Sequence, residues 1–247
     1  MEQFSEFAYV YDELNVNYDK ETIISRMKAL LCGKRDIVDL CCGTGDVAIA
    51  LYKAGFKVTG IDISEDMLNV ATEKAMEQGA RIQFICEDAR DFAVMKKADA
   101  VYSLTDGMNY LLGDNDLKKA FESVYNALNT DGLFIFDVST AYKFENQLKD
   151  KTYTFDFDDE FVVWQSEYDP QSSICTMTIT GFMRERKDLY SRFDEEHKQR
   201  AYSHGEIVNM LEGSGFELCG AYDAYSEECF NDKSERILYV AKKMDKR

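Results

Sequence analysis

The residues with the clearest chemical meaning lie in segment 37–51, where Ile-Val-Asp-Leu-Cys-Cys-Gly-Thr-Gly-Asp precedes an apolar helical pattern. A short apolar run reaches Asp39, and Gly43 and Gly45 follow before the pattern changes. This order predicts a strand, a tight turn and a helix, which is where an open α/β sheet binds its ligand. The glycines permit turn geometry and close approach of the backbone to a ligand. Their spacing also fits a dinucleotide fingerprint, with the acidic Asp62 following the next predicted strand.

The charges near this turn separate two kinds of ligand. Asp39 closes the predicted strand and Asp46 opens the predicted helix. These carboxylates flank the position where a pyrophosphate would need unopposed N–H donors. A ligand that carries an ammonium and a sulfonium group suits an acidic rim better, although an NAD-binding oxidoreductase stays open as the alternative.

The segment Val-Asp-Leu-Cys-Cys-Gly-Thr-Gly resembles motif I of the class I S-adenosylmethionine-dependent methyltransferases, which usually reads hydrophobic-Asp-Leu-Gly-x-Gly-x-Gly. Cys41 stands where that family has its first glycine. On this resemblance, the chain is identified as a methyltransferase that uses S-adenosyl-L-methionine.

The resemblance implies roles for residues at the ends of the next two predicted strands. The Asp62 carboxylate is expected to accept hydrogen bonds from both ribose hydroxyls, and Ile63 and Met67 to contact the adenine. Asp88 is expected to accept from the adenine amino group, and the Ala89 backbone to donate to the ring.

Further positions follow from the same resemblance. Leu104 and Asp106 come after the fourth predicted strand, where these enzymes face cofactor and substrate, and Tyr18 is a candidate for contact with the methionyl end. The expected cofactor-binding residues are Tyr18, Asp39, Cys41, Gly43, Gly45, Asp62, Ile63, Met67, Asp88, Ala89, Leu104 and Asp106.

Three motifs resemble one bacterial subfamily of uncharacterised small-molecule methyltransferases. They are Phe-Ala-x-x-Tyr-Asp at 7–12, Asp-x-x-Asn-Tyr-Leu at 106–111, and Glu-x-His-x-x-Arg-x-Tyr at 195–202. The chain also resembles, more distantly, the nucleotide-sugar N-methyltransferases. The motifs span nearly the whole chain, but they do not identify the acceptor, because this fold serves many acceptors.

Methyl transfer from a sulfonium is a direct displacement, and an acceptor amine or hydroxyl can need a base. Tyr11 and Tyr110 resemble polar residues that flank the methyl group in the nucleotide-sugar enzymes. His197, among acidic neighbours, is the third catalytic candidate, with a surface histidine as the alternative. His204 is expected to be a surface residue at the start of a helix.

The elements that position these residues are predicted by the period of the apolar pattern. Segment 36–138 alternates strands and helices, which indicates βαβ units and a parallel sheet. Segment 151–200 is rich in aromatic and β-branched residues, which predicts antiparallel strands inserted into the α/β domain. The order of these elements resembles that of the methyltransferase family, which implies an α/β, Rossmann-like fold with a seven-stranded, mostly parallel sheet and flanking helices. Residues 1–150 and 201–247 would bind the cofactor, and residues 151–200 would form a β-rich cover over the substrate cleft.

Composition limits the partners. The 247 residues include 29 basic and 46 acidic side chains and carry a formal charge of -17, which argues against nucleic acid as substrate. The seven cysteines form no C-x-x-C pair, and there is no histidine cluster, so no metal is expected. No signal segment or membrane-length apolar run is visible, which predicts a cytoplasmic protein. We expect a monomer or homodimer that acts on a small molecule. A protein-methylating enzyme and a cofactor-binding protein without catalysis are the remaining alternatives.

Overall fold

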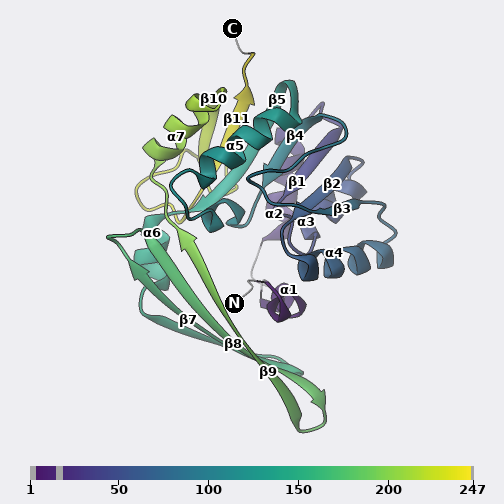
Figure 1. The fold of residues 1–247 in the computed structure, drawn as a ribbon, viewed down its shortest axis with the longest axis vertical. Helices are drawn as coiled ribbons and strands as arrows, with labels where there is room; N and C mark the ends of the chain where they lie inside the picture. Colours follow the sequence, from purple (N-terminus) through teal and green to yellow (C-terminus); the bar gives the residue numbers. More distant parts are fainter. Residues whose placement is uncertain (1–3, 15–18, 246–247) are drawn as a thin grey trace.

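The computed structural model describes residues 4–14 and 19–245. Within these residues, one sheet has seven strands in the order β10-β11-β5-β4-β1-β2-β3 (Figure 1). Its strands are β1 (Asp36–Leu40), β2 (Lys57–Asp62), β3 (Gln83–Cys86), β4 (Ala98–Ser103), β5 (Leu128–Ser139), β10 (Phe216–Asp223) and β11 (Arg236–Lys243). The neighbouring pairs from β1 to β5 are parallel, whereas β11 runs antiparallel to both of its neighbours. The predicted seven-stranded, mostly parallel sheet is confirmed.

Helices cover both faces of this sheet. The longer ones are α2 (Lys20–Leu30), α3 (Asp46–Lys53), α4 (Glu65–Glu77), α5 (Asp116–Ala127) and α7 (His204–Gly213). The short turns are η1 (Glu6–Tyr9), α1 (Tyr11–Leu14), η2 (Gly107–Tyr110), α6 (Ala141–Lys143) and η3 (Phe144–Leu148). Helices α5 and α7 pack with Val101 and Phe134, and α2 and α3 pack with Tyr102 and Ile135 on the other face. Strands buried on both faces read as continuous apolar runs, which is why the central strands were visible in the sequence.

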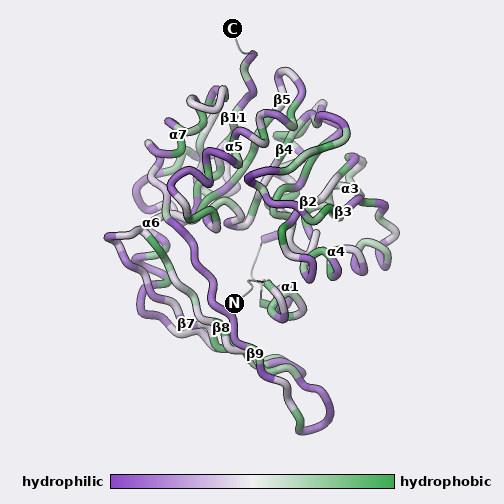
Figure 2. The backbone as a smooth tube through the Cα atoms, in the orientation of Figure 1, coloured by the Kyte–Doolittle hydropathy of each residue, from purple (hydrophilic) through white to green (hydrophobic). Residues whose placement is uncertain are grey.

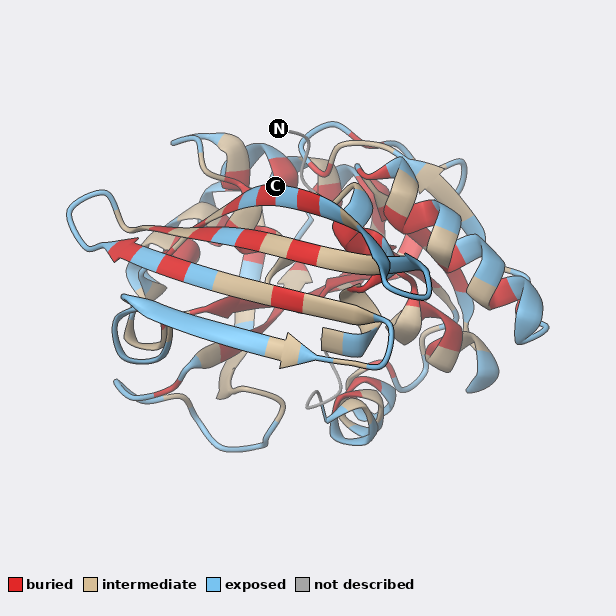
Figure 3. Cartoon of the chain, turned by 90° about the horizontal axis from the view of Figure 1, so that it is seen from below, coloured by how far each residue is buried: buried red, intermediate tan, exposed pale blue. Residues whose placement is uncertain are grey.

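A second sheet is antiparallel and has the order β6-β7-β8-β9. Its strands are β6 (Lys151–Asp156), β7 (Glu160–Asp169), β8 (Ile174–Arg186) and β9 (Leu189–Arg200). In Figure 1 this sheet lies below the larger one. In Figure 3 buried residues alternate with more exposed ones along parts of β7, β8 and β9, whereas β6 is mostly exposed. Its buried face includes Val162, Ile179 and Phe193, which pack against Phe7 and Val10 of the N-terminal segment. The predicted antiparallel strands are confirmed. The division into two domains, with residues 151–200 as a cover, stays a prediction.

Strand β9 departs from the apolar character expected of a buried strand. Figure 2 shows much of it as hydrophilic, yet Glu195, His197 and Gln199 are all buried. Because alternate residues of a strand share a face, these three polar side chains point toward the same interior surface. Buried polar side chains in a row need partners, and their partners lead to the candidate site.

Candidate active site

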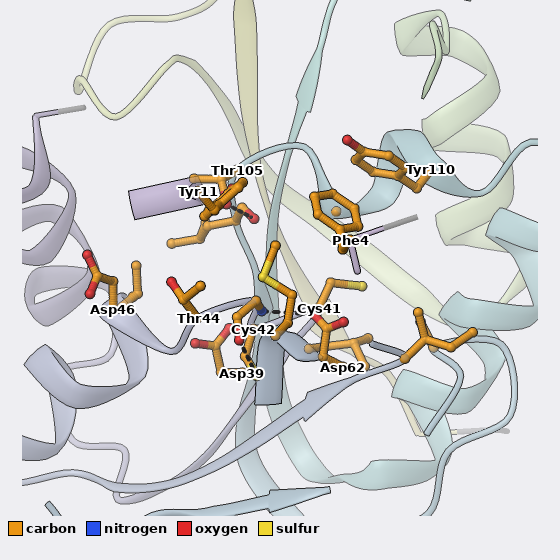
Figure 4. A pocket seen from close by; sticks show the side chains of 18 of the residues that line it. Phe4, Tyr11, Asp39, Cys41, Cys42, Thr44, Asp46, Asp62, Thr105 and Tyr110 are labelled. Atoms are coloured by element: carbon orange, nitrogen blue, oxygen red, sulfur yellow. Dashed lines mark hydrogen bonds between the residues drawn. The ribbon is translucent and has the colours of Figure 1, made fainter. Parts of the chain in front are cut away.

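A cavity of ≈ 270 Å³ lies at the carboxyl ends of β1, β2 and β4 (Figure 4). The predicted cofactor residues that line it are Asp39, Cys41, Gly43, Asp62, Ile63, Met67, Asp88, Ala89 and Leu104. Tyr11 and Tyr110 line it too, on the side opposite Asp39 and Asp62 in Figure 4. Ligands of open α/β sheets bind at this edge, so the structure places most of the predicted site in one cavity.

The turn after β1 shapes the floor of this cavity. Its backbone has positive φ at Cys41 (58°), Gly43 (52°) and Gly45 (75°). A Cβ on Gly43 would meet only the Met67 Sδ, at 3.9 Å, so the missing side chain leaves room above the backbone. A ligand can therefore come close to the Gly43 backbone.

The left-handed backbone at Cys41 explains why glycine is usual at this position in the resembled family. A residue with a Cβ destabilises the fold by roughly 1–2 kcal/mol in this conformation, whereas glycine adopts it without this cost. The Cys41 side chain packs on the core cluster, and this packing offsets part of the cost. Cys41→Gly is therefore expected to keep its fold and its affinity for S-adenosylhomocysteine, as measured by titration calorimetry and thermal unfolding. Lost binding in a folded variant would show that the motif is misaligned.

Gly45 does not line the cavity and has a packing role instead. A Cβ there would lie 3.0 Å from the Ala71 Cβ and 3.1 Å from the Phe84 Cζ, so Gly45 lets α4 and β3 approach the turn. Its predicted contact with the cofactor stays a prediction. Gly45→Val should lower the free energy of unfolding by at least about 2 kcal/mol, through positive φ and overlap together.

Gly79→Val is the matched control, because Gly79 also has positive φ (69°) but no atom within 4 Å of an added Cβ. The difference between the two variants in chemical unfolding measures the overlap alone. Equal losses of stability would contradict the packing role of Gly45.

Asp62 connects the turns that follow β1 and β2. Its Oδ2 accepts from the Gly43 N–H at 2.8 Å, and its Oδ1 accepts from the Ser64 N–H at 3.0 Å. Burial raises the pKa of this carboxyl group, and the backbone donors oppose that shift. Ile63 is a third backbone donor to this carboxylate. The two oxygens have about four lone-pair sites between them, so acceptor capacity is left for a ligand hydroxyl, which is compatible with the predicted ribose contact.

Asp39 is the second acid on the cavity floor, and it is 3% exposed. Burial raises its pKa from 3.8 to about 8, and the nearby charge of Asp62 acts in the same direction. A hydrogen bond from Tyr102 partly opposes this shift. A cationic group in the cavity would stabilise the ionised form of Asp39, which suits the ammonium group of the expected cofactor.

The raised pKa of Asp39 predicts a pH-dependent effect on stability. Between pH 3.8 and about 8 the unfolded chain loses the Asp39 proton while the folded chain keeps it, so this group destabilises the fold increasingly as pH rises. Relative to wild type, Asp39→Asn should become more stable from about pH 4 to about pH 8. Chemical unfolding of the ligand-free protein across this range is the measurement. A difference between variant and wild type that does not change with pH would contradict the shift.

Two other acids of the cavity wall are already paired. Asp88 accepts from the Arg90 Nε at 2.9 Å and from the Arg90 backbone N–H at 2.8 Å, and Arg90 lowers the pKa of its carboxyl group. Asp46 is bound by Lys20 and Lys74, each at 2.8 Å. Asp46 is therefore largely neutralised, and Asp39 and Asp62 are the acids of the predicted rim whose ionised form a cationic ligand would stabilise.

Asp106 lies in a second, adjoining cavity of ≈ 180 Å³. Its carboxylate is bound by Arg236 at 2.6 Å and by the Ser139 Oγ at 2.7 Å, with the Lys143 Nζ at 3.5 Å. Burial raises the pKa of Asp106, but the two cations outweigh it and hold the pKa well below its usual range. Asp106 does not line the first cavity, although its neighbours Thr105 and Gly107 do, and its predicted contact with the cofactor stays a prediction.

The three catalytic candidates meet between the two cavities. Tyr11 and Tyr110 line both, and His197 lines the second. The Tyr110 hydroxyl lies 3.3 Å from the His197 Nδ1. Burial raises the pKa of Tyr11 to about 12 and that of Tyr110 well above its usual value. His197 is 1% exposed, so the alternative of a surface histidine is wrong. His204 opens α7 as expected, and it is half-buried beside the Tyr239 hydroxyl at 3.1 Å.

Some predictions fall outside this geometry, and some site residues were not predicted. Tyr18 lies outside the described residues. Phe4 lines both cavities, although nothing in its sequence context marked it. Arg90 lines the first cavity. It could have been predicted from the sequence, because it lies two residues after Asp88, a predicted site residue of opposite charge.

A family profile described as "Methyltransferase domain" matches residues 37–132. The chain is 35% identical over 240 residues to the Bacillus subtilis protein named "Putative methyltransferase YqeM", covering 96% of each chain. A crystal structure of an S-adenosylmethionine-dependent methyltransferase from Clostridium acetobutylicum shares 29% identity and a TM-score of 0.87, covering 98% of this chain and 99% of the other. CalS10, titled an amino pentose methyltransferase of Micromonospora echinaspora with bound cofactor, has 17% identity and a TM-score of 0.72 over 99% of each chain.

No helix in 4–14 and 19–245 is long and apolar enough to cross a membrane. Over the same residues, no group of three or more histidine, cysteine or acidic side chains is arranged to hold a metal ion.

Proposed function

This chain belongs to the S-adenosylmethionine-dependent methyltransferase family, and we propose that it methylates an amine or hydroxyl group of a small polar molecule. Family membership removes the dinucleotide alternative. The observation that carries the proposal is the arrangement of two adjoining cavities, which share Tyr11 and Tyr110 as a common wall.

The first cavity fits the cofactor. Asp62 supplies paired carboxylate oxygens for ribose hydroxyls, Gly43 leaves an open backbone, and Asp39 is a buried acid that a cation would stabilise. Ile63 and Met67 add apolar surface beside Asp62. When bound, S-adenosylmethionine supplies a methyl group activated by its sulfonium sulfur.

The second cavity fits the acceptor. Its volume of ≈ 180 Å³ suits one small molecule or one end of a larger one, and its wall mixes aromatic and polar side chains. Trp164 lines it, and within the described residues its indole Nε1 is buried with no hydrogen-bond partner. A buried donor of this kind is costly unless it is satisfied, so an oxygen of the acceptor is a suitable partner.

The residues between the cavities would handle the acceptor and its proton. Tyr11 and Tyr110 orient the acceptor, and their buried hydroxyls stay protonated near neutral pH because their pKa values are raised. The acceptor proton passes to Tyr110 or directly to His197. The antiparallel sheet, from which His197 projects, keeps bulk water from this space.

The structural relatives agree with a small polar acceptor without identifying it. CalS10 is titled an amino pentose methyltransferase, and KedS8 of Streptoalloteichus, at a TM-score of 0.76 and 17% identity, is titled a sugar N-methyltransferase. We carry over only the chemical class, a polar molecule with an amine or hydroxyl group.

The test is acceptor-dependent release of S-adenosylhomocysteine by the purified protein. A panel of small amines, amino sugars, amino acids and hydroxyl compounds is offered with S-adenosylmethionine. At least one class should raise release above the acceptor-free rate, and the Tyr110→Phe variant should lower that increment. Release that no small amine or hydroxyl compound stimulates would contradict the proposal.

A further inference from the structure

Glu195 on β9 is a buried carboxylate with an unusual number of donors. Its Oε1 accepts from the Ser5 N–H at 3.1 Å, the Ser5 hydroxyl at 2.9 Å and the Phe7 N–H at 2.9 Å. Its Oε2 accepts from the Phe4 N–H at 2.8 Å and contacts the His197 Nε2 at 3.0 Å. It is 3% exposed. One side chain therefore holds both the N-terminal segment and the candidate base.

This contact determines the proton positions on the His197 ring. Burial raises the pKa of Glu195, but the hydrogen bonds from His197 and residues 4–7 outweigh it and lower the pKa, so the carboxylate is ionised. An ionised carboxylate only accepts, so the Nε2 of His197 carries a proton and donates it. When the ring is neutral, its Nδ1 has a lone pair that can accept from the Tyr110 hydroxyl, 3.3 Å away.

The segment that Glu195 binds also crosses the site. The Phe4 carbonyl accepts from the Ser64 hydroxyl at 2.7 Å, on the cofactor side. The Phe4 ring lies 4.5 Å from the His197 ring and 5.2 Å from the Tyr110 ring, centroid to centroid. Residues 4–7, called the strap below, are thus attached to the antiparallel sheet at Glu195 and to α4 at Ser64.

We propose that Glu195 is a positioning residue that keeps His197 in the Nε2-protonated form and fastens the strap across the two cavities. The proton-accepting pair of Tyr110 and His197 is then fully assembled only when the strap is in place. This inference rests on the proposed function for its catalytic meaning, but its structural content stands apart from it.

The proton route balances. The X–C bond forms as the carbon–sulfur bond of the methyl donor breaks, and the electron pair of the broken bond stays on sulfur. The acceptor X–H proton moves to the Tyr110 oxygen, and the Tyr110 proton moves to the Nδ1 of His197. The ring becomes an imidazolium, and the adjacent Glu195 carboxylate stabilises the positive charge. Without the proton on Nε2, the lone pair on Nδ1 would not be available and this route would be blocked.

The first measurement uses the unmodified protein. The chain has 2 histidines, so the ¹⁵N NMR spectrum of protein labelled at histidine contains the signals of two imidazole rings. A His204→Asn variant shows which signals belong to His197. In the neutral ring of His197, Nε2 should be protonated and Nδ1 bare. A neutral ring with its proton on Nδ1 would overturn the proposal, whether or not any variant folds.

The second measurement compares Glu195→Gln with Glu196→Gln. In the Glu195→Gln variant, the side-chain oxygen should occupy the position of Oε1, because three donors point there. The NH₂ group then occupies the position of Oε2, where it faces the Phe4 N–H and the His197 Nε2. Because the NH₂ group donates, the Nε2 of His197 must accept, and the ring proton should be on Nδ1. The Phe4 amide loses its acceptor, so its hydrogen should exchange with solvent about tenfold faster or more. Glu196 points to the opposite face and pairs with Lys198 at 2.8 Å, so its variant should change neither readout.

The outcomes separate this inference from the proposed function. An unchanged ring form and unchanged Phe4 exchange in folded Glu195→Gln would overturn the positioning role, even if methyl transfer occurs. A changed ring form and faster exchange would uphold it, even if no small acceptor is methylated. Neither readout requires turnover.

Discussion

Replacing His197 by asparagine is expected to lower the rate of methyl transfer by roughly 10²–10⁴-fold, the usual contribution of a general base. The affinity for S-adenosylhomocysteine should change little, because His197 lines the second cavity and not the first. Single-turnover kinetics with an accepted substrate and calorimetric titration of S-adenosylhomocysteine measure the two quantities separately.

The control for this variant is His204→Asn. His204 is the other histidine of the chain, and it lies at the start of α7, hydrogen-bonded to Tyr239. It should keep nearly the full rate. If Tyr11→Phe costs more than His197→Asn, positioning of the acceptor outweighs proton transfer, and the base assignment fails.

Asp62→Ala is expected to weaken S-adenosylhomocysteine binding by about 1.5–3 kcal/mol, the range for hydrogen bonds to a charged group. The carboxylate also holds the Gly43 and Ser64 N–H groups, so the alanine variant loses order in both turns. Asp62→Asn keeps one acceptor oxygen and should show a smaller loss. Calorimetric titration of both variants gives the comparison.

Asp46→Asn is the matched control for the Asp62 variants. Asp46 also lines the first cavity, but Lys20 and Lys74 neutralise its charge. Its variant should bind S-adenosylhomocysteine with nearly the wild-type affinity. Equal losses at Asp46 and Asp62 would mean that general charge, and not a specific contact at Asp62, determines affinity.

Local patterns predicted the alternating strands and helices and the floor of the first cavity, and the resemblance to the family supplied the seven-stranded sheet. The apolar runs of β1 and β2 end in acids and glycines whose chemistry depends on neighbours a few residues away. Asp39, Gly43 and Asp62 could therefore be placed together, because the carboxyl ends of parallel strands meet at one edge.

The rest depends on contacts between distant parts of the chain. Glu195 binds Phe4 across 191 positions, and no local pattern reports such a pair. Asp46 pairs with Lys74 and Asp106 pairs with Arg236. These partners are also distant in the sequence, so the local charge at each aspartate could not be predicted from its neighbours in the chain. Gly45 shows a further limit, because a glycine needed for packing against Phe84 looks identical in sequence to one needed by a ligand.

The most direct test follows the transferred methyl group. The protein is incubated with S-adenosylmethionine labelled in its methyl carbon and with a cell extract, and the label is then followed into small molecules, proteins and nucleic acids. We predict that it enters the small-molecule fraction, and that Tyr110→Phe and His197→Asn reduce this transfer. Label that enters protein or nucleic acid, and leaves the small-molecule fraction unlabelled beyond the cofactor, would contradict the proposed function.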